Sequence, residues 1–174
     1  MERKELLKRL DLSSFIAFDF ETTGLDHQID KIIEVAAIKF IDGEIADRYV
    51  ELVNPGISIP AVITEITGIS DKMVRSSPSE ELIIDDLLSF IGEDPLVAHN
   101  IHFDEKFLYQ LCNRLGRDVL KNAQYDTLQL ARSVLYDQPV FNLSALSEYF
   151  GLSSKGAHRA EKDTENTGLM FLEL

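Results

Sequence analysis

The segment FIAFDFETTG, residues 15–24, combines an apolar, aromatic run of strand length with two carboxylates and a turn signal. Because side chains alternate between the two faces of a strand, Asp19 and Glu21 share one face, while Phe18 and Phe20 point into the core. Two neighbouring carboxylates repel each other and are costly to desolvate without a partner. The pattern predicts a hard-cation site at the end of this strand, since Mg²⁺ and Mn²⁺ prefer oxygen ligands. An ordinary solvent-exposed strand end is the alternative.

The segments that follow predict further strands. Residues 32–41 form a second strand, and Asp42-Gly43 is a hairpin signal that leads to a third strand at about 45–53. Short strands are expected at 95–98 and 123–125. Three antiparallel strands followed by alternating helices and strands predict an α/β fold, with a mixed five-stranded sheet flanked by helices.

Helical spacing of apolar residues predicts the helices that cover this sheet. The first is a short amphipathic helix with Leu6, Leu7 and Leu10 on one side. The predicted helices span residues 2–10, 61–67, 79–91, 103–115, 127–135, 143–150 and 161–174, with a loop over 151–156.

The bulk composition predicts one globular domain over residues 1–174, with residues 1–12 as an N-terminal helical extension. Hydrophobic residues make up 45% and charged residues 27% of the chain. The chain shows neither a signal peptide nor a membrane-spanning run, and the single Cys112 excludes an internal disulfide. A cytoplasmic protein is expected. The last helical pattern runs to Leu174 without a stop signal, which leaves open that the domain belongs to a longer chain.

The net charge of −13 argues against strong nonspecific binding of DNA, because affinity for phosphates normally comes from Lys and Arg. It does not argue against a metal-assisted nuclease. Bound divalent cations would add positive charge where acids cluster. The C-terminal part also places Lys155, Arg159 and Lys162 close together.

Two further groups of polar residues extend the acidic pair. Asp104 lies in the first turn of the helix over 103–115, where the helix dipole favours an anion. His158 and Asp163 form a His-x4-Asp pair at the start of the last helix. Five residues of a regular helix turn through about 500° and leave the two side chains about 140° apart. We therefore expect His158 on the loop and Asp163 in the first helical turn. Dipole compensation and a solvated histidine are the alternatives.

Together these segments resemble the three motifs of the DEDDh exonuclease family, which includes the proofreading subunit of bacterial replicative polymerase. The histidine in the third motif separates them from relatives that carry tyrosine there. The resemblance covers about residues 15–174 and implies a ribonuclease H-like fold. The motifs are Asp19-Phe20-Glu21-Thr22-Thr23-Gly24, His99-Asn100-x-x-Phe103-Asp104 and His158-x4-Asp163.

Two other segments look like particular members of that family. Residues 63–70 are similar to the segment after the third strand in bacterial proofreading-type domains. Residues 158–174 resemble the exonuclease domains of DinG-type helicase-related proteins and of Gram-positive replicative polymerases.

The resemblance implies 3′–5′ hydrolysis of DNA with two divalent cations, Mg²⁺ or Mn²⁺, about 3.5–4 Å apart. In this assignment Asp19 bridges both ions, while Glu21 and Asp163 complete the first site. Asp104 supports the second ion, partly through water. His158 is the general base, because imidazole titrates near neutral pH. The expected partners are 3′ ends of single-stranded DNA and a DNA polymerase or helicase, in the same chain or another.

A pocket for the terminal nucleotide is expected beside the acids. Backbone groups of Thr22, Thr23 and Gly24 approach the last sugar, and Leu25 wedges between the last two bases. Phe103 faces the sugar or base, with core packing as its alternative. The remaining two candidates for the pocket are His99 and Asn100.

Other residue types are assigned structural roles. Cys112 belongs to the core, Asp126 caps a helix, and His27 and His102 lie on the surface. A phosphate-binding GxxxxGK[ST] loop is absent from the sequence. Two rival functions remain: an exoribonuclease acting on short RNA, and a catalytically silent docking domain of a larger enzyme.

Overall fold

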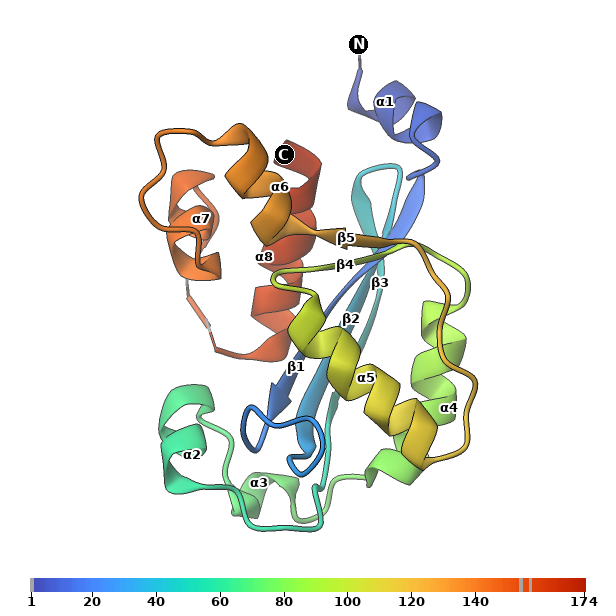
Figure 1. The fold of residues 1–174 in the computed structure, drawn as a ribbon, viewed down its shortest axis with the longest axis vertical. Coiled ribbons are helices and arrows are strands. Elements are labelled where there is room, and N and C mark those ends of the chain that lie inside the picture. Colours follow the sequence, from blue (N-terminus) through green and yellow to red (C-terminus); the bar gives the residue numbers. More distant parts are fainter. Residues whose placement is uncertain (1, 154, 157) are drawn as a thin grey trace.

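The computed structural model describes residues 2–153, 155–156 and 158–174 (Figure 1). Its centre is a five-stranded sheet with the strand order β3-β2-β1-β4-β5. The first three strands are antiparallel neighbours, while β4 and β5 run parallel to β1. The predicted mixed sheet is confirmed. The strands are β1 (Ser14–Thr22), β2 (Ile32–Ile41), β3 (Glu44–Leu52), β4 (Leu96–Ala98) and β5 (Gln124–Asp126).

The β2–β3 hairpin has the predicted two-residue turn. Asp42 and Gly43 both have positive φ values, 53° and 87°. Ile41 pairs with Glu44 directly across the turn. Two successive left-handed residues match the twist of the flanking strands, which is why Asp-Gly is favoured there.

The helices agree with the predicted segments, with one addition. Residues 71–74 form a four-residue helix that was not predicted, because one turn is too short to show helical periodicity. The helices are α1 (Arg3–Arg9), α2 (Ala61–Thr67), α3 (Asp71–Val74), α4 (Glu80–Ile91), α5 (His102–Arg114), α6 (Thr127–Val134), α7 (Leu143–Tyr149) and α8 (Ala160–Glu173). Among the described residues, none of the helices has the length and apolar character needed to cross a bilayer.

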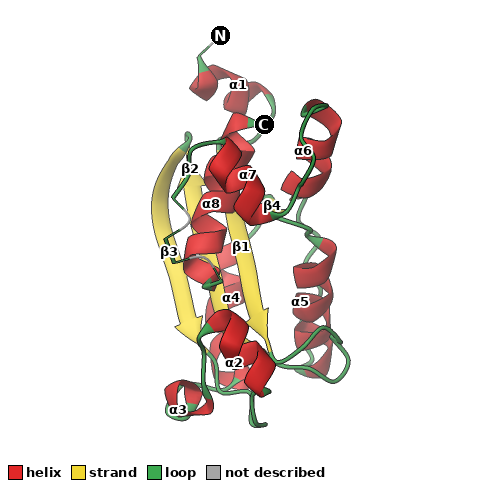
Figure 2. Cartoon of the chain, turned by 90° about the vertical axis from the view of Figure 1, so that its left-hand side faces the viewer, coloured by secondary structure: helices red, strands yellow, loops and turns green. Residues whose placement is uncertain are grey.

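The prediction that three leucines of α1 form one apolar face is only partly right. Leu7 is buried, whereas Leu6 and Leu10 are 40% and 54% exposed. In Figure 2, α1 lies beyond one end of the sheet, and α2 and α3 lie beyond the other. A helix at the end of a sheet meets little of the sheet's apolar surface, and of these three leucines only Leu7 is buried there.

The two faces of the sheet bury separate cores. Phe18 and Phe20 are buried with α4 and α5 on one face, as predicted, and Cys112 belongs to the same cluster. On the other face, Phe15 and Phe40 pack against α8. Because Asp19 and Glu21 continue the alternation of Phe15, the sheet directs these acids towards α8.

Gly168 allows α8 to lie close to the sheet. A Cβ atom at this position would overlap the ring of Phe40, which is fully buried and stacked on Phe15 with ring centroids 4.8 Å apart. Gly168→Ala is expected to lower the free energy of unfolding by about 1–3 kcal/mol, although alanine is the better helix former. Urea denaturation measures the change.

Two further variants test the assignment of that loss to crowding. Ser144→Ala, at an exposed position in α7, should change stability by less than about 0.5 kcal/mol. Gly168→Ala combined with Phe40→Leu should lose less than the sum of the single variants, because the smaller side chain makes room. Strict additivity would contradict the proposed overlap.

Candidate active site

Three carboxylates meet on the α8 side of the sheet. Asp19 and Glu21 come from β1, and Asp163 comes from the first turn of α8. Each offers an oxygen atom, and these oxygens all lie within 4.8 Å of one another. This donor set fits a hard divalent cation, because converging carboxylate oxygens repel one another unless a cation or protons neutralise them.

Asp104 is not one of these three acids; it comes from α5 on the other face of the sheet, and its charge acts on Asp19. It is 2% exposed, lies in the first turn of α5, and its Oδ1 accepts a 3.0 Å hydrogen bond from the backbone N–H of Phe20. β4 pairs with β1 only at Ile16 and Ala17, so the edge of β1 near Phe20 lies beyond that pairing. The carboxylate thus satisfies a buried strand N–H while lying beside Asp19.

Burial raises the pKa values of all four acids, and neighbouring carboxylates, Glu34 among them, add to the shifts. Desolvation, then the charge of Asp104, raises the pKa of Asp19 well above its usual range. Desolvation and the charges of Asp163 and Glu34 raise the pKa of Glu21 to about 7. Desolvation likewise raises the pKa of Asp104 to about 8 and that of Asp163 above its usual range. Each shift favours a proton or a metal ion in the site.

These shifts predict how pH affects the stability of the metal-free protein. A carboxyl whose pKa is higher in the folded than in the unfolded state stabilises the fold below about pH 4. That contribution is lost as pH rises through the folded value, about 7 for Glu21 and about 8 for Asp104. The melting temperature in EDTA should therefore fall between about pH 6.5 and 8.5, and Mg²⁺ should reduce the fall.

The acids affect stability in a different pH range from His99, which is also partly buried and has a shifted pKa. Desolvation lowers the pKa of His99, so its contribution to stability is complete once pH exceeds about 6.5. Asp104→Asn should weaken the pH dependence in calorimetric melts. A melting temperature that rises across this window in EDTA would contradict the assignment.

His158 and Asp163 lie as the sequence predicted, one in the loop and one in the helix. His158 has a positive φ of 63°, and its backbone N–H donates a 3.0 Å hydrogen bond to Oδ2 of Asp163. His158 is exposed. This turn therefore holds a solvent-accessible imidazole next to the third carboxylate of the cluster.

A groove of about 230 Å³ is lined by Leu25 and Phe103, together with His27, Asn100, His102, Lys106 and Phe107. Leu25 is 84% exposed, an unusual position for a large apolar side chain. Phe103 is half-buried, and its ring lies 5.0 Å from that of Phe107. The groove presents an exposed apolar side chain and an aromatic ring, and a nucleobase can stack on surfaces of this kind.

The backbone of Thr22, Thr23 and Gly24 is largely engaged within the protein. The Thr22 hydroxyl donates to the Gly24 carbonyl at 2.6 Å. The Thr23 N–H donates to the Lys31 carbonyl at 2.8 Å, and its hydroxyl donates to Asp30 at 2.9 Å. A Cβ atom on Gly24 would overlap the Asp30 carboxylate, so close packing of this loop explains the glycine. The loop presents Leu25 on a rigid base.

His99 and Asn100 have different places. Both ring nitrogens of His99 are hydrogen-bonded, Nδ1 with the Thr127 hydroxyl at 2.9 Å and Nε2 with the Phe141 carbonyl at 3.0 Å. The histidine thus connects the loop before α5 to the segment before α7. Asn100 is exposed at the groove, and its backbone N–H donates to Asp126, which also caps α6 as predicted.

Glu34 is the residue near the site that the motifs did not indicate. It is 1% exposed and pairs across the strands with Glu21. Its signal in the sequence is a single glutamate inside the apolar run of residues 32–38. Such an acid needs a buried partner, and the sequence alone did not show that Arg159 supplies it.

Known proteins resemble the chain over nearly its whole length. The family model described as "Exonuclease" matches residues 16–171. The PolC-type DNA polymerase III of Staphylococcus saprophyticus is 36% identical over 165 residues, which cover 95% of this chain and 12% of that protein. The PolC-type DNA polymerase III of Caldanaerobacter subterraneus is 38% identical over 160 residues, covering 92% and 11%. The chain thus spans about a tenth of the length of these relatives.

Solved structures show the same fold. Escherichia coli exonuclease I, in a complex with single-stranded DNA, superposes with a TM-score of 0.83 at 21% identity, over 92% of this chain and 40% of that one. Exonuclease X bound to 5′-overhanging duplex DNA gives a TM-score of 0.69 at 27% identity, over 92% and 89%. With its motifs intact and the family match extending from residue 16 to 171, the chain belongs to the exonuclease family, in its DEDDh group.

Proposed function

We propose that this domain is a metal-dependent 3′–5′ exonuclease that removes nucleoside 5′-monophosphates from single-stranded or frayed DNA, in replication proofreading or repair. The observation that carries the proposal is the convergence of oxygens from Asp19, Glu21 and Asp163 within 4.8 Å. Asp104 lies against the same strand and completes the acidic set of the family. The intact set also speaks against a silent docking domain.

Asp19, Glu21, Asp104 and Asp163 would hold two divalent cations, Mg²⁺ or Mn²⁺. When bound, such ions activate the attacking water and stabilise charge on the leaving oxygen. Of the four acids, Asp19 and Glu21 come from β1, Asp104 from α5 and Asp163 from α8. Its buried walls limit solvent, which strengthens electrostatic interactions inside.

His158 is the general base of this proposal. In this role the imidazole would accept the proton of a water held beside the acids, and the backbone bond of His158 to Asp163 fixes the turn that carries it. The imidazole accepts a proton from the attacking water as the P–O bond to the leaving 3′-oxygen breaks. A neutral imidazole is required for this step.

The groove with Leu25 and Phe103 would hold the 3′-terminal nucleotide. Leu25, which is exposed in this groove, would separate the last two bases, and Phe103 would contact the terminal sugar or base. Unpaired bases are accessible to such contacts, whereas stacked and paired bases are not. We therefore expect a preference for a frayed or single-stranded end. The exposed Asn100 would contribute from the rim, and the backbone of Thr22, Thr23 and Gly24 supports the loop.

The identity of the products and the substrate test this function. A linear single strand should yield nucleoside 5′-monophosphates, and a circular single strand of the same composition should stay intact. Internal fragments from the circle would show an endonuclease and reject the proposal. Matched DNA and RNA oligomers, degraded side by side, decide between the proposed activity and the exoribonuclease alternative; faster degradation of RNA would favour the alternative.

The PolC relatives and the net charge of −13 support a partner that supplies affinity for DNA. Few phosphate contacts mean little counterion release, so we expect the isolated domain to leave its substrate often. A polymerase or helicase, in the same chain or another, would hold the DNA. Unlabelled trap DNA added after the first turnover should stop the degradation of labelled DNA. Long uninterrupted degradation in the presence of the trap would contradict this expectation.

A further inference from the structure

Glu34 is a buried acid next to the catalytic carboxylates. It is 1% exposed, lies on β2 and pairs across the strands with Glu21. Strand alternation places it on the face that carries Asp19 and Glu21. A charged carboxylate in such a position is costly unless its charge and lone pairs are satisfied. An apolar residue would fill the same space without this cost, so the polar contacts of Glu34 need an explanation.

The carboxylate of Glu34 binds two residues at the start of α8, Arg159 and Ala160. The Arg159 guanidinium binds the carboxylate as a fork, with Nε 3.1 Å from both oxygens and Nη2 also donating. The backbone N–H of Ala160 donates to Oε2 at 2.9 Å. Arg159 is the N-cap residue of α8 and makes no side-chain cap of its own. A strand carboxylate therefore caps the helix over a long distance in the sequence.

These contacts lie between the two functional residues of the third motif. His158 directly precedes Arg159, and Asp163 accepts hydrogen bonds from the His158 N–H while donating its own N–H to the Arg159 carbonyl. Fixing Arg159 and Ala160 against β2 thus fixes the loop on one side and the first helical turn on the other. The loop residue His158 gains a defined place relative to β1.

We infer that Glu34 and Arg159 are positioning residues, which hold His158 and Asp163 in register with Asp19 and Glu21. The inference rests on the proposed nuclease function. A second consequence follows from charge. Glu34, which lies across the strands from Glu21, occupies the Arg159 guanidinium. Without Glu34, the freed guanidinium would compete with metal ions for Glu21.

The test compares Glu34→Gln, Arg159→Gln and the double variant. Glutamine at position 34 keeps an oxygen for the Ala160 N–H but loses the charge that holds Arg159. Loss of a partner that orients metal ligands typically reduces metal affinity or activity about 10–100-fold. We expect Glu34→Gln to lower kcat and Mn²⁺ affinity by such factors, with little change in KM for DNA. The double variant should bind Mn²⁺ more tightly than Glu34→Gln, because no competing guanidinium remains.

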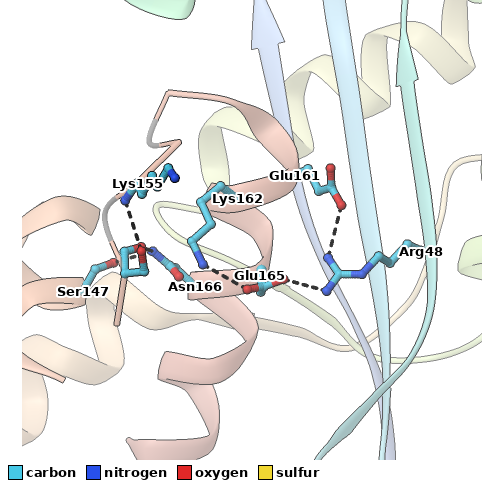
Figure 3. Close-up of polar contacts among 8 residues, drawn as sticks. Arg48, Ser147, Lys155, Glu161, Lys162, Glu165 and Asn166 are labelled. Carbon is cyan, nitrogen blue, oxygen red and sulfur yellow. Dashed lines mark hydrogen bonds and ion pairs between the residues drawn. The ribbon is translucent and has the colours of Figure 1, made fainter. Parts of the chain in front are cut away.

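Arg48→Gln is the matched control. Arg48 on β3 also ties the sheet to α8, through ion pairs with Glu161 at 3.4 Å and Glu165 at 2.6 Å (Figure 3). Those contacts involve neither Glu34 nor the carboxylates of the cluster and are partly exposed, so kcat and Mn²⁺ affinity should stay near those of the unmodified protein. Calorimetric titration with Mn²⁺ alone measures affinity independently of turnover.

The outcomes separate the inference from the function on which it rests. If Glu34→Gln melts at a lower temperature but its kcat and Mn²⁺ affinity remain within twofold of the unmodified protein, the pair is only structural and the inference is wrong. If Glu34→Gln does not fold, Arg159→Lys takes its place, because lysine keeps the charge and loses the fork. It should still lower kcat. An unmodified protein without nuclease activity would instead reject the proposed function.

Discussion

Asp19→Ala is expected to reduce turnover on single-stranded DNA by about 10³-fold or more. Asp19 shares an oxygen cluster with Glu21 and Asp163, and the charge of the buried Asp104 also acts on it. Loss of the ligand proposed to serve both cations removes several kcal/mol of stabilisation from the transition state, and each 1.4 kcal/mol is a factor of ten. A fluorescent or radiolabelled oligonucleotide assay in Mg²⁺ measures the rate.

The fold should survive this substitution. Removing one of several repelling acids relieves the metal-free site, so Asp19→Ala should melt in EDTA no lower than the unmodified protein. Asp47→Ala, at an exposed position on β3, is the control and should retain full turnover. If Asp19→Ala keeps near-normal turnover, the two-ion assignment is wrong.

His158→Ala should lower kcat by about 10²–10⁴-fold, the usual cost of removing a general base. Metal binding should persist, because the carboxylates remain and His158 contacts Asp163 through its backbone N–H.

Asp163→Ala provides the contrast. It removes an oxygen from the metal cluster and the acceptor for the His158 N–H, so both metal affinity and rate should fall. Calorimetric titration beside a rate assay distinguishes the two variants. If His158→Ala loses metal binding as completely as Asp163→Ala, the histidine is a ligand or a support, and the mechanism needs revision.

The sequence predicted the fold well where the signals are local. Alternation along residues 15–21, the Asp42-Gly43 turn and the helical spacing after residue 103 each depend on neighbours in the chain. α3 was not predicted, because four residues are too few to show a helical periodicity of apolar residues. The exposure of Leu6 and Leu10 could not be foreseen, because it depends on where α1 meets the end of the sheet.

In the candidate site, too, some positions follow from the local sequence and others depend on the packed fold. The motifs indicated the acids of β1, the loop position of His158 and the helical position of Asp163. The bond from the Phe20 N–H to Asp104 depends on how far β4 extends along β1, which only the assembled sheet shows. Glu34 and Arg159 are 125 residues apart in sequence, so their pairing is a property of the packed fold.

One experiment tests the account most directly: digestion of a single strand labelled at either its 3′ or its 5′ end, in Mg²⁺, Mn²⁺ or EDTA. A 3′ label should be released at once as a mononucleotide, while a 5′ label should pass through a ladder of progressively shorter strands. Both reactions should stop in EDTA and resume when Mg²⁺ or Mn²⁺ is restored. Immediate release of the 5′ label, or undiminished digestion in EDTA, would contradict a metal-dependent 3′–5′ exonuclease.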